Sequence, residues 1–235
     1  MASVKKFTAY EVVNQIRHVE RTIDNPSNKD IDPDKIDHNY FLSPERNMTS
    51  YQYYKELRGS VYMYNRKDVK VLAGWIITQP QDLPPGDSDR FFSACYDFLN
   101  ETYGGESACV SCVVHADEAG EMPHMHYLFM PLTTNNKYKP APQEGPDTRR
   151  ESEKFEQKIC ANDVLTRDHL VSFHTRLQHA IDAAGLSCRV KTGVTRRQGG
   201  NRTVAELKAE RPRLRDRGRW HDDPSVTRNR ERGRW

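Results

Sequence analysis

The hydrophobic periodicity of this 235-residue chain predicts a mixed fold of helices and strands, with an antiparallel hairpin in its second half. Apolar residues recur at helical spacing in four segments, whereas three short apolar runs have the length and flanking turn residues of strands. The predicted helices are residues 10–21, 50–64, 87–103 and 166–184, and the predicted strands are residues 71–78, 107–114 and 124–132. Two helices therefore come first, followed by strand, helix, hairpin and helix.

The two N-terminal helices follow from the spacing of apolar residues and from the loop between them. The first segment carries an apolar stripe on one helical face, formed by Val12, Val13, Ile16 and Val19. Prolines and polar residues then interrupt the pattern until about residue 38, so we predict a loop there. Residues 50–64 resume a helical pattern.

The rest of the chain alternates between strands and helices, and glycine marks two of the boundaries. Residues 71–78 form a short apolar run, as expected of a buried strand. The helix at 87–103 ends at Gly104 and the helix at 166–184 ends at Gly185, in the position where glycine terminates helices most readily.

Three of the chain's nine histidines lie within twelve residues, at the ends of the two hairpin strands. His124 and His126 share one face of their strand, because side chains alternate along a strand with a period of two. His115 closes the preceding strand and can supply a third imidazole. Three converging neutral imidazoles are typical of a divalent-metal site that keeps open positions for substrate. Three unrelated histidines in a hairpin are the alternative.

Charge is distributed unevenly along the chain. The net charge is +3, but residues 202–235 hold 11 Lys and Arg against 6 acids, which leaves −2 for residues 1–201. We therefore expect a folded domain over 1–192, with a flexible polar loop near 133–157, and a flexible Arg-rich tail over 193–235. Such a tail is typical of an arm for nucleic acid or another polyanion. A low-complexity tail without set structure fits equally well, and the Arg-Gly-Arg-Trp repeat within it has no assigned role.

Composition argues against a membrane or exported protein. Mean hydropathy is −0.88, and no apolar stretch approaches the roughly 20 residues that a membrane-spanning helix needs. The N-terminus lacks the apolar segment of a secretory signal. We therefore expect a cytoplasmic protein.

The five cysteines are an odd number in a chain of this kind, which argues against a disulfide framework. Cys109 and Cys112 match the C-x-x-C pattern of some metal sites. Residues three apart on a regular strand point to opposite faces, however, so we predict buried thiols.

The histidine motif resembles a known enzyme family. A hydrophobic residue between two histidines, as at His124–His126, is the signature of HUH endonucleases. Together with Pro123 and with His115, Asp117 and Glu118, the run closely resembles the third motif of the MobV plasmid mobilisation relaxases, also called Mob/Pre plasmid recombination enzymes.

Two further stretches match that family in order. Residues 18–21 resemble its first motif, a histidine followed by arginine three residues later, although Val19 stands where the family commonly has Asn. Residues 28–32, continuing to Asn39 and Tyr40, resemble its second motif. The resemblance covers roughly residues 10–190.

The resemblance implies an α+β fold, in which a central antiparallel sheet carries the His-x-His pair on a middle strand and helices pack on it. It implies a relaxase, a site- and strand-specific DNA nickase that acts by transesterification. Its partner would be single-stranded or supercoiled plasmid DNA at an origin of transfer, and its role would be plasmid mobilisation and recombination. Separately from the resemblance, we favour a monomer.

The resemblance also implies a role for each site residue. His18 would be the nucleophile and form a covalent 5′-phosphate–histidine intermediate. Arg21 would pair with the phosphate, and Glu118 would orient a ligand histidine or handle a proton. The metal ligands would be His115, His124 and His126, with Mn or Mg as the expected ion and Zn, Co or Ni as other possibilities. The expected DNA contacts are Tyr40, Arg66 and Lys67.

Several alternatives stay open at this point. A histidine such as His18 on an amphipathic helix is usually a surface residue, and Arg21 could pair with Glu20 or Glu11. A tyrosine could replace histidine as the nucleophile, and the candidates are Tyr10, Tyr40, Tyr51, Tyr53 and Tyr54. The whole chain could instead be a three-histidine zinc hydrolase or a catalytically inactive DNA-binding remnant of a mobile element. Only a nickase would form a covalent adduct with DNA.

Overall fold

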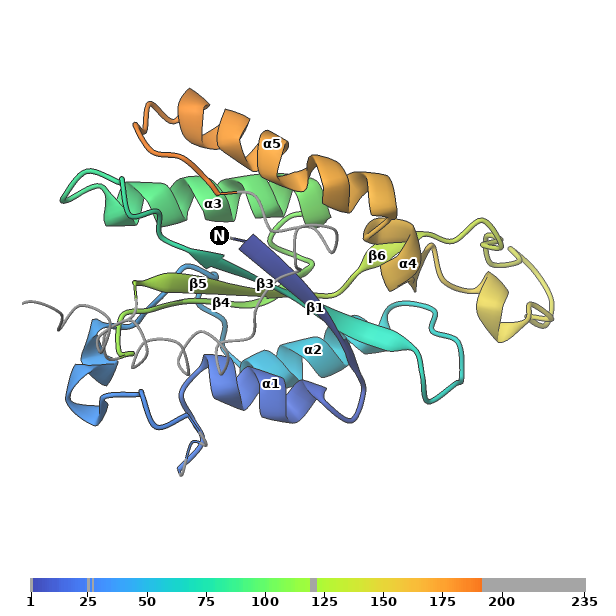
Figure 1. The fold of residues 1–235 in the computed structure, drawn as a ribbon. Helices are drawn as coiled ribbons and strands as arrows, with labels where there is room; N and C mark the ends of the chain where they lie inside the picture. The colour runs from blue at the N-terminus through green and yellow to red at the C-terminus, as the bar shows by residue number, and fades with distance from the viewer. Residues whose placement is uncertain (1, 25, 27, 119–121, 192–235) are drawn as a thin grey trace, which may run out of the picture. The chain divides into compact units, whose positions relative to one another are not determined.

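The computed structural model describes residues 2–191, apart from residues 25, 27 and 119–121 (Figure 1). Its centre is a five-stranded antiparallel sheet with strand order β1-β3-β5-β4-β2. The strands are β1 (Ala2–Thr8), β2 (Tyr40–Phe41), β3 (Lys70–Thr78), β4 (Cys109–His115) and β5 (His124–Phe129). The histidine pair therefore lies on the middle strand, and the predicted α+β fold is confirmed.

Helices cover both faces of the sheet (Figure 1). On one face lie α1 (Val12–Val19) and α2 (Ser50–Gly59), and on the other lie α3 (Ser88–Tyr103) and α5 (Arg167–Ala183). The short α4 (Ala161–Val164) precedes α5. No helix in the described part of the chain is long and apolar enough to cross a bilayer.

The two faces bury separate hydrophobic clusters. Beneath α3 and α5, the Trp75 ring of β3 stacks on Phe173 with ring centroids 3.5 Å apart, and its Nε1 donates to the Tyr103 hydroxyl. Beneath α1, the predicted stripe of Val12, Ile16 and Val19 is buried against the other face. This packing is what places the last turn of α1 over the sheet.

Helix α1 is shorter than the predicted segment 10–21, for reasons visible at both ends. Before it, the Glu11 carboxylate accepts hydrogen bonds from the backbone and hydroxyl of Thr8. After it, Arg21 adopts φ of +53°, in the left-handed region, which ends helical geometry. The chain therefore turns sharply three residues after His18.

The polar segment predicted as a loop near 133–157 is framed by a second small sheet. Strand β6 (Leu132–Thr134) pairs with β7 (Gln157–Ile159), and between them lies only a short 3₁₀ turn, η2 (Glu151–Glu153). A further 3₁₀ turn, η1 (Pro33–His38), lies in the predicted N-terminal loop. The predicted tail over 193–235 lies outside the described residues.

The C-x-x-C cysteines are free and buried, as predicted, but the geometric reason from simple alternation is wrong. The register of β4 against β5 shifts between Cys109 and Ser111. This β-bulge adds one residue to β4, so Cys109 and Cys112 pack into the same cluster under α3 and α5. Burial raises the pKa of Cys109 to about 12, so that thiol stays protonated near neutral pH.

Candidate active site

Three buried histidines meet on the face of the sheet that α1 covers. The β4–β5 pairing sets His115 opposite His124, and alternation along β5 brings His126 to the same side. One possible ligand atom from each lies within 4.8 Å of the others. Their ring centroids are 4.6 to 5.3 Å apart. The structure therefore brings the three predicted metal ligands together.

The hydrogen bonding of His115 suits a metal ligand. Its Nε2 lies 2.7 Å from the carbonyl oxygen of Val19, and because a carbonyl only accepts, that nitrogen carries the ring proton. Its Nδ1 is then the nitrogen with a free lone pair, and this buried atom has no hydrogen-bond partner. A ring oriented through one nitrogen with the other left open is the usual arrangement of a metal-binding histidine.

Burial keeps two of these imidazoles, those of His115 and His126, neutral. It lowers the pKa of His115 to about 3, assisted by the positive charge of Arg21. It lowers the pKa of His126 well below the ordinary value, assisted by the neighbouring His115 and His124. Because only a neutral imidazole ligates a metal, the donor set fits a divalent cation.

A second group within the described residues, formed by His115, Asp117 and Glu118, also brings three possible ligand atoms within 4.8 Å. Both of its carboxylates are already bound to the guanidinium of Arg21. The three histidines are therefore the better metal site.

His18 lies beside this cluster, in the last turn of α1. Its ring meets that of His126 edge to face, with centroids 5.7 Å apart. The side chain is half-buried, and its pKa is lowered by burial and by the charge of Arg21, with Lys5 contributing. A neutral imidazole with an available lone pair is thus placed next to the three clustered histidines.

The candidate tyrosines have no such placement. Tyr10 is 73% exposed in the turn before α1, Tyr51 stacks on the buried Tyr54, and Tyr53 donates to the carbonyl of Ser107. Among the described residues, the one aromatic ring in contact with His18 is that of His126.

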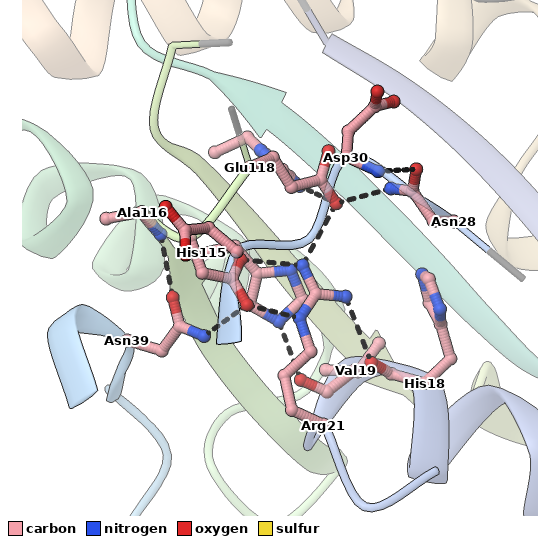
Figure 2. Close-up of polar contacts among 12 residues, drawn as sticks. His18, Val19, Arg21, Asn28, Asp30, Asn39, His115, Ala116 and Glu118 are labelled. Atoms are coloured by element: carbon pink, nitrogen blue, oxygen red, sulfur yellow. Dashed lines mark hydrogen bonds and ion pairs between the residues drawn. The ribbon is translucent and has the colours of Figure 1, made fainter. Parts of the chain in front are cut away.

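Arg21 joins the end of α1 to the loop after β4 (Figure 2). Its Nε and Nη2 donate to the two oxygens of Asp117 at 2.7 and 2.8 Å, and Nη2 also donates to Glu118 at 2.9 Å. Nη1 lies 3.4 Å from the carbonyl oxygen of His18. The side chains of Arg21 and Asp117 are only 6% and 0% exposed. Neither Glu20 nor Glu11, the partners suggested by the sequence, takes part.

Two asparagines of the second motif complete this network, and sequence reasoning assigned them no role. Asn39 donates to Asp117 at 2.9 Å and accepts from the backbone of Ala116, while Asn28 donates to Glu118 at 3.1 Å. Burial alone would raise the pKa of Asp117, but hydrogen bonds from Arg21 and Asn39 lower it to about 2. The sequence signal that could have identified Asn28 and Asn39 as site residues was their place in the second motif.

The predicted DNA contacts lie apart from the histidines. Tyr40 packs on the opposite face of the sheet, where its hydroxyl donates to Asp89 of α3 and burial raises its pKa. Arg66 and Lys67 precede β3, whereas it is the far end of β3, at Thr78, that pairs with His124. Glu118, by contrast, lies beside the cluster, with Oε1 4.0 Å from Nε2 of His124.

The fold is shared with known structures. The relaxase domain of MobM, crystallised with Mn and bound to plasmid pMV158 oriT DNA, has a TM-score of 0.66 to this chain at 24% identity, covering 90% of this chain and 98% of that domain. A second crystal structure of the same domain gives a TM-score of 0.65 at 25% identity, covering 89% and 98% of the two chains. This likeness concerns the fold.

Sequence comparison reaches the same group. A plasmid recombination enzyme of Bacillus thuringiensis is 30% identical over 174 residues, which cover 72% of this chain and 34% of that protein. One from Lactiplantibacillus plantarum is 25% identical over 221 residues, covering 91% and 54% of the two chains. The chain thus spans between about a third and about half of the length of these relatives. The family model of plasmid recombination enzymes, Mob_Pre, matches residues 1–201, and the chain belongs to this family.

Proposed function

We propose that this chain is a relaxase that nicks one strand of plasmid DNA at an origin of transfer and reseals it by transesterification. The observation that carries the proposal is the meeting of His18 with three buried histidines, the His18 and His126 ring centroids being 5.7 Å apart. The oriT DNA in the MobM crystals supports the choice of substrate. The reaction would take place in the cytoplasm, during plasmid mobilisation and recombination.

His115, His124 and His126 would hold one divalent cation, with Mn or Mg ahead of Zn, Co and Ni. Mn is favoured by the Mn-bound MobM crystals. When bound, such a cation supplies Lewis-acid polarisation of a phosphate oxygen. The chain's own part is to keep the imidazoles of His115 and His126 neutral by burial and, through the Val19 carbonyl, to fix the orientation of His115.

His18 would carry out the covalent step. The lone pair of a neutral ring nitrogen attacks phosphorus, and the bond from phosphorus to the 3′ oxygen breaks. The proton that the ring gives up goes to that oxygen, so the products are a 5′-phosphate on His18 and a free 3′-hydroxyl. Attack by the 3′-hydroxyl on the phosphoramidate reverses every step and reseals the strand.

Arg21 and Glu118 would act mainly by positioning. Two of the three Arg21 nitrogens bind carboxylates, which ties the helix end that carries His18 to the loop after β4. Nη1, with only a 3.4 Å contact to the His18 carbonyl, is the donor left for the phosphate pairing that the family motif implies. Glu118 holds Arg21 and faces His124.

The remaining sequence predictions join the proposal. The chain would act as a monomer on single-stranded or supercoiled DNA, with Tyr40, Arg66 and Lys67 as more distant DNA contacts. Residues 1–192 would form the relaxase domain, and the basic segment 193–235 would add affinity for phosphate.

The decisive experiment is to trap the covalent adduct. The protein is incubated with Mn²⁺ and a supercoiled plasmid that carries the region upstream of its own gene, and nicked circles are measured. Mass spectrometry should place DNA on the peptide that contains His18. His18→Ala should lose nicking and keep DNA binding, whereas His179→Ala, an exposed histidine of α5, should behave as wild type.

Other outcomes point elsewhere. An adduct on the peptide with Tyr40 or Tyr51 would show a tyrosine nucleophile. Turnover of a small substrate with no adduct would indicate the zinc hydrolase, and DNA binding without nicking would indicate the inactive remnant.

A further inference from the structure

We propose that Lys5 binds a backbone phosphate of the DNA strand, next to the phosphate that His18 attacks. The inference rests on the proposed function and adds a residue to it. Lys5 lies outside all three motifs of the family resemblance, on the edge strand β1.

The starting observation is a small cavity beside the nucleophile. It has a volume of about 80 Å³, and its walls include His18 and His126 together with Lys5, Gln15 and Gly74. The cavity therefore opens directly on the reacting side chain.

Strand pairing explains how Lys5 reaches this place. Lys5 lies opposite Gly74 of β3, and Gly74 in turn lies opposite Leu128 of β5, two residues from His126. Lys5 and His126 thus share one face of the sheet, with the side-chain-free Gly74 between their strands. The side chains of Leu128 and Phe7 pack over Gly74, and all three residues help to line the cavity.

The cavity is suited to an anion. None of the residues that line it is acidic, and Gln15, one turn before His18 on α1, adds a neutral polar side chain. Lys5 is exposed and forms no ion pair with the residues that the structure describes. The neighbouring lysines differ, because Lys6 donates to Asn162 and Lys70 pairs with Glu11.

The class of anion follows from the proposed substrate. A DNA strand carries a backbone phosphate at every nucleotide, so further phosphates flank the one that His18 attacks. A backbone phosphate held by a lysine charge also fits a contact that positions the strand without reading its sequence.

The test compares two neighbouring lysines on one strand. Lys5→Gln and Lys6→Gln remove the same charge from opposite faces of β1. Each protein is assayed for nicking of the supercoiled plasmid with Mn²⁺, and for binding of a fluorescein-labelled oligothymidylate across a range of salt concentrations. Melting temperatures confirm folding, and Lys5→Arg restores the charge.

We expect Lys5→Gln to raise the plasmid concentration for half-maximal nicking about tenfold, the size of a lost hydrogen bond to a charged group. The slope of log affinity against log salt should fall by about 0.7, the value for one phosphate contact on a single strand. Lys5→Arg should recover most of both effects, and Lys6→Gln should change neither by more than about twofold.

Nicking and salt dependence that are unchanged in Lys5→Gln would overturn the inference, as would an equal loss in Lys6→Gln, which would show a general charge effect. If Lys5→Gln fails to fold, Lys5→Arg decides: wild-type behaviour supports a charge role, and a loss of nicking in the folded protein contradicts it. If the wild-type protein forms no nicked circles, the proposed function fails. The salt dependence of oligothymidylate binding, compared between wild type and Lys5→Gln, still tests whether Lys5 binds a phosphate.

Discussion

Arg21 has an unfavourable left-handed backbone conformation, and its side chain forms a buried ion pair. The ion pair explains how the backbone conformation is tolerated. A non-glycine residue at φ of +53° costs on the order of 1 kcal/mol or more. The bidentate contact with Asp117 holds the residue in this conformation, because both side chains are almost fully buried.

Removing one partner of this pair should therefore destabilise the protein strongly. Asp117→Ala leaves a buried guanidinium without its main acceptor, and we expect the free energy of unfolding to fall by about 3–5 kcal/mol. Asp68→Ala is the matched control, since the Arg66–Asp68 pair is 69% and 74% exposed and its loss should cost less than about 1 kcal/mol. Urea denaturation measures both, and equal effects would contradict the structural role of Arg21.

The histidine cluster makes a prediction that needs no DNA. Mn²⁺ at a hundred times its dissociation constant should stabilise the folded protein by about 2.7 kcal/mol, seen as a higher melting temperature. His126→Ala should stay folded and lose this response, because it removes one of the three converging ligands. The exposed His179→Ala should keep it. A metal response that survives in His126→Ala would place the ion elsewhere.

Within β3, Gly74 is required by the close packing of three strands. A Cβ at this position would lie 2.8 Å from Cδ2 of Leu128 and 3.3 Å from Cε2 of Phe7. Gly74→Ala should therefore lower the free energy of unfolding by about 1–3 kcal/mol, the usual cost of overpacking. Gly59→Ala at the end of α2 has nothing within 4 Å and should be neutral or slightly stabilising. Thermal melts of the two variants decide whether β3 and β5 approach as closely as described.

The elements that could be predicted from sequence are those with local signals. The stripe of α1, the apolar run of β3 and the helix bounded by Gly104 each have a periodicity or a terminator within their own residues. Strand β1 has neither a periodicity nor a terminator, because it is a polar edge strand in which only Ala2 and Phe7 are buried. Its partner β3 also begins some sixty residues later. The bulge in β4 depends on pairing with β5 and is equally invisible to a simple alternation rule.

The site residues also divide into those with a local sequence signal and those that depend on distant parts of the chain. His115, His124 and His126 could be predicted because the hairpin that brings them together is local in sequence. The role of Asp117 could not be predicted, since its partner Arg21 lies 96 residues away. Lys5 could not be predicted at all, because only the order of strands in the sheet places it near His18.

For the molecule as a whole, charge distribution makes one further prediction. Deleting residues 202–235 removes a net charge of +5 and turns the rest of the chain slightly negative. DNA binding should weaken more at low salt than at high salt, since fewer counterions are released, while the position of the nick stays the same. Filter binding across salt concentrations measures this. Equal affinity of the two proteins at every salt concentration would show that these arginines serve another purpose.

The long separation between the halves of the site has a kinetic consequence. The contacts of Val19 with His115 and of Arg21 with Asp117 each close a loop of 96 residues. Contacts so distant in sequence form late, after the entropy of closing the loop has been offset by other structure. During refolding, the hairpin can gather its three imidazoles early, but His18 joins them only when the sheet is complete. Under the proposed function, the ability to nick DNA would therefore arise only with the last step of folding.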